Sequence, residues 1–185
     1  MDTSLRDYID QNKKKISWLH KLHIIFDVVK AIRRIHDEGY VINNLDSSMI
    51  FYSKDKHDWY LDPSFLCGAN NLRKICGKIS YTAPEVLESY DYSKKSDIYS
   101  LAIIMCEIIN ENEPFKEYNL NDIELSMNII DGLRPQLTVR AENSTSEPLN
   151  DLIELCWNKR KDARPNITTI WNEIENLVVT YIRCY

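Results

Sequence analysis

The chain has 185 residues, 44% of them apolar, and its 23 basic and 28 acidic side chains give a formal charge of −5. This composition fits one domain with a core of its own and excludes an intrinsically disordered chain. The acidic balance argues against nucleic acid as the main partner, and no apolar run is long enough to span a bilayer.

The first forty residues predict two helices. Ser4, followed three residues later by Asp7, is typical of a helix N-cap. Apolar side chains recur every three or four positions over residues 17–37. This spacing predicts an amphipathic helix with Ser17 as its N-cap and Gly39 just beyond its end.

Short extended segments are predicted directly after this helix. Runs of β-prone residues cover 40–42, 49–52 and 59–61, so we expect three small strands joined by loops. Residues 67–96 show no sustained period and contain Pro84, which predicts an ordered long loop with one short helix.

A buried helix is predicted over residues 97–110, because this stretch is apolar on nearly every side. We expect Ser96 or Asp97 to cap it. Cys106 lies in this helix and Cys156 in a later apolar stretch, so both are expected to be small buried side chains. The five cysteines are odd in number and match no zinc spacing, which indicates a reducing, intracellular compartment.

Three more helices are predicted over residues 121–131, 148–157 and 166–180. The polar residues 136–147 predict an exposed loop between the first two. The apolar positions of the first helix are Ile123, Met127 and Ile130. The apolar face of the last helix consists of Ile167, Ile170, Trp171, Ile174, Leu177 and Val178.

Five short motifs follow one another along the chain. They are Ile35-His36-Asp37-Glu38-Gly39-Tyr40, Ala83-Pro84-Glu85, Ser96-Asp97-Ile98-Tyr99-Ser100-Leu101-Ala102, Cys156-Trp157 and Arg164-Pro165. In this order they resemble the C-terminal lobe of eukaryotic protein kinases, in the style of the tyrosine-kinase-like group, over about residues 4–180. The resemblance implies a mainly α (α+β) fold with a few short strands around the catalytic loop, in one domain over residues 1–185.

The resemblance also implies structural roles for three charged residues. It predicts that Asp97 binds backbone amides of the catalytic loop and that Glu85 pairs with Arg164. The alternatives are a helix N-cap for Asp97 and an unpaired surface acid for Glu85. In the activation segment, the candidates for phosphorylation or for ordinary structural roles are Ser80, Tyr81 and Thr82.

The catalytic loop departs from the kinase pattern H-R-D-L-x-x-x-N. Residues 42–49 align with it through Leu45, and Asn44 then takes the position of the aspartate that accepts the substrate proton. Met49 takes the position of the asparagine that binds the second metal ion, and a thioether is a poor ligand for Mg²⁺. Asn43 replaces the arginine. We therefore expect none of the usual catalytic residues here.

Asp62 lies thirteen residues after Met49, which is the spacing of the metal-binding D-F-G motif. Pro63 follows it in place of Phe and restricts the backbone of Asp62. Asp62 is thus either a vestigial metal ligand or a loop aspartate. A register shifted by two residues would instead put Asp46 in the base position.

The chain opens on a segment that resembles the helix after the kinase hinge, so we expect the N-lobe to be absent. Phe51, near the floor of the nucleotide pocket in the family, would then face solvent in an apolar patch. Either a partner covers this face, or the chain is a fragment of a longer gene or the product of an incomplete gene model. No cofactor is expected for this chain, and ATP and Mg²⁺ only if an N-lobe exists upstream.

These features lead to three hypotheses. The first is a catalytically impaired pseudokinase or kinase fragment that acts in cytoplasmic signalling through protein–protein interaction, without nucleic acid or membrane partners. The second is the C-terminal part of a true ATP-dependent protein kinase, specific for Ser/Thr or Tyr. The third is a decaying paralogue that folds poorly. Whether the chain is an enzyme is left open by the sequence.

Overall fold

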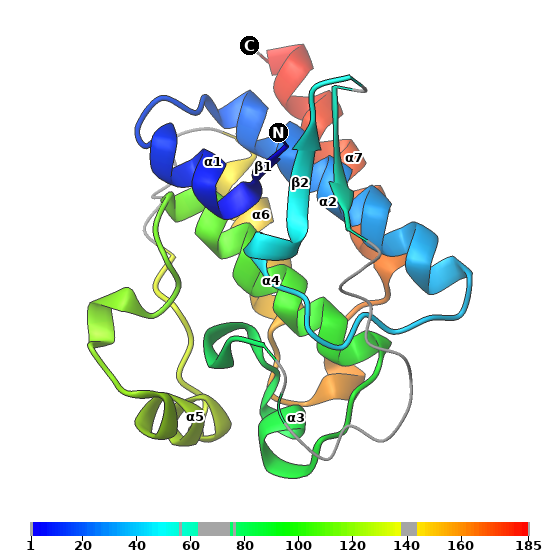
Figure 1. Cartoon of the computed structure of the whole chain (residues 1–185). Coiled ribbons are helices and arrows are strands. Elements are labelled where there is room, and N and C mark those ends of the chain that lie inside the picture. The colour runs from blue at the N-terminus through cyan, green and yellow to red at the C-terminus, as the bar shows by residue number, and fades with distance from the viewer. Residues whose placement is uncertain (1, 56, 63–74, 76, 138–143, 185) are drawn as a thin grey trace.

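The computed structural model describes residues 2–55, 57–62, 75, 77–137 and 144–184. The described part is mainly α-helical, with a small sheet beside the N-terminus (Figure 1). The predicted mainly α fold with a few short strands is therefore confirmed. None of the described helices combines the length and the apolar character needed to cross a bilayer.

Helix α4 (Lys94–Asn110) runs through the centre of the domain, and all its residues from 96 to 109 are buried (Figure 1). The predicted buried helix is confirmed, but its predicted start is wrong. Ser93 is the N-cap, and its side chain and that of Ser96 form a capping box. The apolar pattern begins only at Ile98, so it could not reveal the polar first turn.

Helices α1 (Leu5–Gln11) and α2 (Trp18–Asp37) form as predicted. The Ser4 hydroxyl accepts a hydrogen bond from the Asp7 amide at 3.2 Å, so it caps α1. Ser17 caps α2 in the same way. Both helices thus begin where a hydroxyl side chain satisfies an otherwise unpaired amide.

Helix α2 packs along α7 (Ile167–Cys184), and the rings of Phe26 and Trp171 lie 4.4 Å apart between their centroids. Ile167, Ile170 and the other predicted face residues of α7 point toward the core, fully or in part. The predicted apolar face of this helix is confirmed.

The sheet has the order β1-β2-β3 and is antiparallel throughout, with β1 (Thr3–Ser4), β2 (Ile50–Ser53) and β3 (Asp58–Leu61). The register places Phe51 opposite Tyr60. Strands β2 and β3 are two of the three predicted strands.

The third predicted strand, at residues 40–42, is wrong. No strand is assigned there, because the Ile42 amide donates to the Asp97 side chain and not to a neighbouring strand. The two-residue β1 was not predicted, since two residues show no alternation.

The β2–β3 hairpin rests on α2. Lys30 on α2 lies 2.9 Å from the Asp58 carboxylate at the start of β3. Trp59 is buried, and its ring lies 5.2 Å from that of Tyr8 and 5.3 Å from that of Tyr52, centroid to centroid. Polar and aromatic contacts thus fix the hairpin against two helices.

Three shorter helices complete the domain: α3 (Pro84–Ser89), α5 (Asp122–Asp131) and α6 (Ser146–Cys156). Short 3₁₀ turns include η1 (Ser47–Met49), directly before β2, and η3 (Ile79–Tyr81), shortly before α3. Residues 67–74 and 76 of the predicted loop over residues 67–96 lie outside the described residues, and α3 is the one short helix predicted within it.

The predicted apolar face of α5 is wrong. Leu125 and Ile129 are buried, whereas Ile123 is 75% exposed and Met127 is 62% exposed. The helix carries apolar residues on two faces, and periodicity alone could not tell which face meets the core.

The predicted exposed loop at residues 136–147 is wrong at its end. Thr145 is buried and accepts a hydrogen bond from the Trp18 indole at 2.8 Å, and Ser146 is also buried.

The predicted burial of Cys106 and Cys156 is confirmed, and burial raises the pKa of both thiols to about 12.

Candidate functional site

Asp97, near the start of α4, anchors the stretch that aligns with the kinase catalytic loop. Its carboxylate accepts hydrogen bonds from the amides of Ile42 at 2.9 Å and Asn43 at 3.0 Å. The His36 ring nitrogen lies 2.8 Å from the same carboxylate. Asp97 is 1% exposed, so these bonds form away from water. This is the role that the kinase resemblance implies for it, and Ser93 takes the N-cap role.

The backbone turns sharply at Asn43, directly before Asn44. Asn43 has φ +72°, in the left-handed region that asparagine tolerates better than most residues. The Asn44 side chain lies against Gly77, where an added Cβ would come within 3.5 Å of it. Gly77 itself has φ +96°. Asn44 therefore faces the segment that leads into η3.

Little free space remains at the base position. Asn44, Gly77, Lys78 and Tyr81 help to line a cavity of about 10 Å³. A cavity of this size holds about one water molecule. On the side of Gly77 and Lys78, Asn44 therefore borders a space that holds about one water molecule.

Met49 and Asp62 lie side by side, since the Asp62 amide donates to the Met49 carbonyl at 3.2 Å. The structure thus brings together the two positions that the resemblance assigns to metal ligands. Met49 is buried and offers only a thioether, whereas Mg²⁺ takes oxygen ligands. Within the described ranges, no group of three His, Cys, Asp or Glu residues is arranged to hold a metal ion. These residues do not fit a two-metal kinase site.

Asp46, the base in the shifted register, has the contacts of a structural cap. One carboxylate oxygen accepts from the Ser48 amide at 2.7 Å and from the Ser48 hydroxyl at 2.5 Å. Lys78 lies 3.6 Å from the same oxygen. Asp46 is buried and serves as the N-cap of η1.

A buried carboxylate near this loop was not anticipated from the sequence. Glu107, in the middle of α4, has no solvent exposure. It lies 2.5 Å from the Arg6 guanidinium and accepts from the hydroxyls of Tyr81 at 2.7 Å and Ser47 at 3.0 Å. Burial raises the pKa of Glu107, and the Tyr81 hydrogen bond and the Arg6 charge oppose that rise. The cluster joins α1, η1, η3 and α4.

One signal in the sequence points to this cluster. Glu107 is the only charged residue between Ile98 and Asn110. An acid inside a fully buried helix requires a partner. The partner, Arg6, lies 101 positions away, so no local pattern could identify it.

The three activation-segment candidates differ in accessibility. Tyr81 is 3% exposed, and its hydroxyl donates to Glu107. Burial and the Glu107 charge hold the pKa of Tyr81 well above its usual range. Thr82 donates to the Lys78 carbonyl at 3.0 Å, and Ser80 is half-buried. Phosphorylation of Tyr81 would require this cluster to open.

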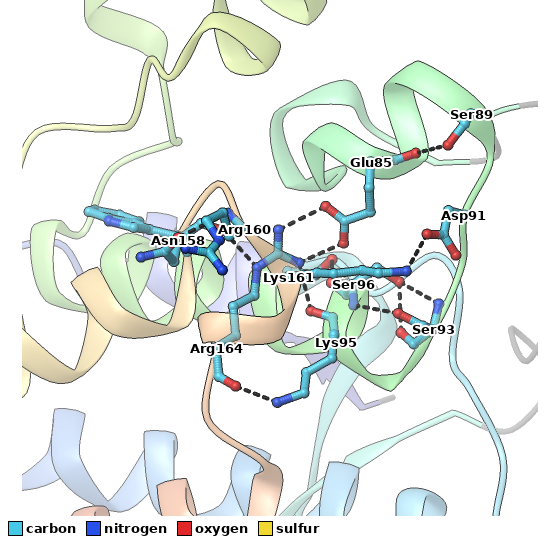
Figure 2. A network of polar contacts seen from close by, with 12 residues as sticks. Glu85, Ser89, Asp91, Ser93, Lys95, Ser96, Asn158, Arg160, Lys161 and Arg164 are labelled. Atoms are coloured by element: carbon cyan, nitrogen blue, oxygen red, sulfur yellow. Dashed lines mark hydrogen bonds and ion pairs between the residues drawn. The ribbon is translucent and has the colours of Figure 1, made fainter.

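Glu85 and Arg164 form a two-pronged ion pair (Figure 2). The two guanidinium nitrogens lie 2.6 Å and 2.8 Å from the two carboxylate oxygens. Arg164 also donates to the carbonyls of Asn158 and Lys95, each at 2.8 Å, and it stacks over the Tyr99 ring. The side chain of Arg164 is fully buried, so this pair ties α3 to the segment before α7.

Phe51 does not face solvent as expected. It is half-buried, and its ring lies 6.2 Å from that of Tyr60, its partner across the sheet. Large apolar side chains are exposed elsewhere among the described residues: Tyr40, Tyr90, Ile123, Met127, Leu155, Val179 and Ile182. Phe51 itself is therefore more buried than expected.

Comparisons with known proteins agree with this arrangement. Over 92% of its length, the chain is 26% identical to a putative serine/threonine-protein kinase/receptor of Acanthamoeba polyphaga mimivirus, of which it covers 10%. It is 27% identical, over 95% of its length, to the RGS domain-containing serine/threonine-protein kinase A of Dictyostelium discoideum, of which it covers 15%. A probable LIM domain-containing serine/threonine-protein kinase of the same organism is 23% identical over 94% of the chain, which covers 26% of it.

The chain thus spans between 10% and 26% of the length of these relatives. The sequence also matches the family defined by the protein kinase domain, over residues 1–174. With Asp97 bound to the catalytic-loop amides and Glu85 paired with Arg164, the chain belongs to the protein kinase domain family.

Proposed function

We propose that this kinase domain is catalytically impaired and acts in cytoplasmic signalling as a protein-binding module, in the style of a tyrosine-kinase-like pseudokinase. The observation that carries the proposal is Asn44 in the base position. The hydrogen bonds from Ile42 and Asn43 to Asp97 support this register, because they anchor the two residues directly before Asn44.

The chemistry of phosphoryl transfer supports impairment. Catalysis in this class depends on metal ions, charge neutralisation and a positioned nucleophile. A general base contributes roughly 10²–10⁴ in rate, or about 3–5 kcal/mol of the barrier, and an amide cannot replace a carboxylate in this role. Met49 removes an oxygen ligand beside Asp62. We therefore expect no cofactor for this chain, and ATP with Mg²⁺ only if an N-lobe precedes it.

The structural part of the kinase pattern is retained, which supports a binding role. The pair of Glu85 and Arg164 is complete, and Asp97 makes its full set of bonds. A chain that keeps these buried polar contacts has what it needs to hold one fold. The third hypothesis, a chain that folds poorly, is disfavoured by this completeness and is tested by a cooperative thermal melt.

The test is a phosphotransfer assay on the purified chain, with ATP, Mg²⁺ and a generic protein substrate. We expect no turnover above background. Turnover by the unmodified chain that Asp62→Ala abolishes would overturn the proposal, because it would show a working metal site.

A second candidate function is the C-terminal part of an active serine/threonine kinase. It is favoured by the small share of each relative that the chain covers, 10–26%, and by the description of those relatives as serine/threonine-protein kinases. Mapping the 5′ end of the native transcript tests it. An in-frame Gly-rich strand and strand lysine upstream of Met1 would favour this candidate, and the assay above would then be repeated on the extended protein.

A further inference from the structure

Helix α5 has an apolar face that the fold does not use. Leu125 and Ile129 meet the core on the side of α3 and η3. Ile123 and Met127 point to solvent, and Ile130 is half-buried. Figure 1 shows α5 at the edge of the molecule, beside α3 and far from α7. Two large apolar side chains exposed on one short helix are a feature that folding does not explain.

The exposed apolar residues form one row. Positions i, i+4 and i+7 lie within about 60° of one another around a helix, and Ile123, Met127 and Ile130 have this spacing. At a rise of about 1.5 Å per residue the row is about 10 Å long. This is the spacing with which one helix presents anchor residues to another.

An acidic row runs beside the apolar row. Glu124 and Asp131 are exposed, and their seven-residue spacing places them one above the other on the same flank of the helix. Asp122 adds a third acid, and α5 contains no lysine or arginine. We name the two rows together (Ile123, Met127, Ile130, Glu124 and Asp131) the α5 surface.

The α5 surface is held in shape by both ends of the helix. Asn121 accepts from the amides of Ile123 and Glu124, and Glu124 accepts from the Asn121 amide, which completes a capping box. Gly132, with φ +115°, closes the C-terminal end. A surface that is already ordered loses little conformational entropy when a partner binds.

We infer that the α5 surface is a docking site for a basic amphipathic helix of a partner protein. The apolar row would receive the apolar face of that helix, and Glu124 and Asp131 would face its lysine or arginine side chains. The inference rests on the proposed binding function and names the kind of partner.

The experiment measures binding of a synthetic peptide of about four helical turns to the full chain by isothermal titration calorimetry. The peptide carries leucines at i, i+4 and i+7 and lysines along one flank, and a control peptide carries glutamates in place of the lysines. We expect only the basic peptide to bind, with an affinity that falls as salt rises. Amide NMR shifts should map its contact to α5.

Variants of the chain then test whether the peptide binds through the α5 surface or only through the net negative charge of the protein. The double variant Ile123→Ser with Met127→Ser should weaken binding at least about tenfold, because it truncates the two exposed anchors. Asp131→Lys should weaken the binding of the basic peptide and strengthen the binding of the acidic peptide. The matched control is Leu155→Ser on α6, which is also exposed, at 54%, and should leave binding unchanged.

Three outcomes would overturn the inference. They are no binding of the basic peptide, equal binding by the double variant, and shifts that map to another face. A fourth, self-association of the chain that the double variant abolishes in sedimentation, would identify a second copy as the occupant instead. ATP turnover does not enter these readouts, so failure here is distinguishable from failure of the proposed function.

Discussion

The carboxylate of Glu107 lies 2.5 Å from the guanidinium of Arg6, and this contact joins the centre of α4 to the first helix of the chain. Glu107 is fully buried, while the Arg6 side chain is 15% exposed. Burial of an acid is unfavourable unless it is paired, and here Tyr81 and Ser47 complete the pairing. The cluster therefore holds α1 and the activation segment on one central helix.

Glu107→Ala should destabilise the domain by about 3–5 kcal/mol, because it leaves the buried hydroxyls of Tyr81 and Ser47 without their shared acceptor and removes the buried partner of Arg6. Arg6→Met should cost less, since two hydroxyl donors remain on Glu107. Urea denaturation measures both. The control is Asp10→Asn, which removes only the exposed partner of Arg6. An equal effect of all three variants would contradict this account of the cluster.

Arg164→Met should destabilise the domain by about 3–5 kcal/mol, because Glu85 and the carbonyls that Arg164 binds would lose their donor. Arg164→Lys should restore only part of this loss, since an ammonium cannot make the two-pronged pair. Thermal melts measure both effects. Lys161→Met removes the surface pair with Asp91 in the same region (Figure 2) and should leave the melting temperature unchanged. A full rescue by lysine would show that charge alone matters here.

Asp97→Asn should expose the catalytic-loop backbone. The amides of Ile42 and Asn43 each donate to a different oxygen of Asp97, and an amide side chain keeps only one acceptor. We expect at least about tenfold faster hydrogen exchange at one or both amides, measured by NMR. Asp37→Asn, at an exposed position of α2, is the control. Unchanged exchange in Asp97→Asn would mean that the loop does not depend on this carboxylate.

Asp27 should make stability depend on pH. Burial, and then the nearby Asp58 charge, raise its pKa to about 6, while Lys30 and the Trp59 amide oppose the rise. The folded state therefore holds a proton that the unfolded chain has released above about pH 4. Stability from this group is present at low pH and is lost as pH rises from about 4 to about 6.

The measurement compares the free energy of unfolding of the chain and of Asp27→Asn between pH 4 and pH 7. Relative to the variant, the chain should lose about 1–2 kcal/mol across this window, a value reduced for the partial exposure of Asp27. The comparison is needed because the pKa of Asp58 is lowered, so its contribution has the opposite sign. Parallel pH profiles would show that Asp27 titrates normally.

The two faces of α5 should respond differently to truncation. Ile129→Ala should cost about 2–4 kcal/mol, because it opens a cavity where the side chain is fully buried. Met127→Ala, on the exposed face, should change stability by about 0.5 kcal/mol or less. Chemical denaturation compares them. Similar losses for both would mean that the outer face also packs against the fold.

Much of the candidate site could be placed from the sequence, because its spacing follows a family pattern. The positions of Asn44, Met49 and Asp62 came from that pattern, and the structure then showed Met49 and Asp62 in backbone contact. The small cavity beside Asn44 could not be foreseen, since it depends on how Gly77 and Lys78 approach from another segment. The half-burial of Phe51 depends likewise on its cross-strand neighbour, Tyr60.

The sequence by itself determined the long helices, because their apolar spacing and their hydroxyl caps are local properties. Helices α2 and α7 form where periodicity predicted them, and α4 does so from Asp97 onward, with a polar first turn before it. Only the tertiary structure decided which face of α5 is buried and which partner neutralises Glu107. Both outcomes depend on contacts between residues far apart in the chain, and a local pattern contains no information on which surfaces will meet.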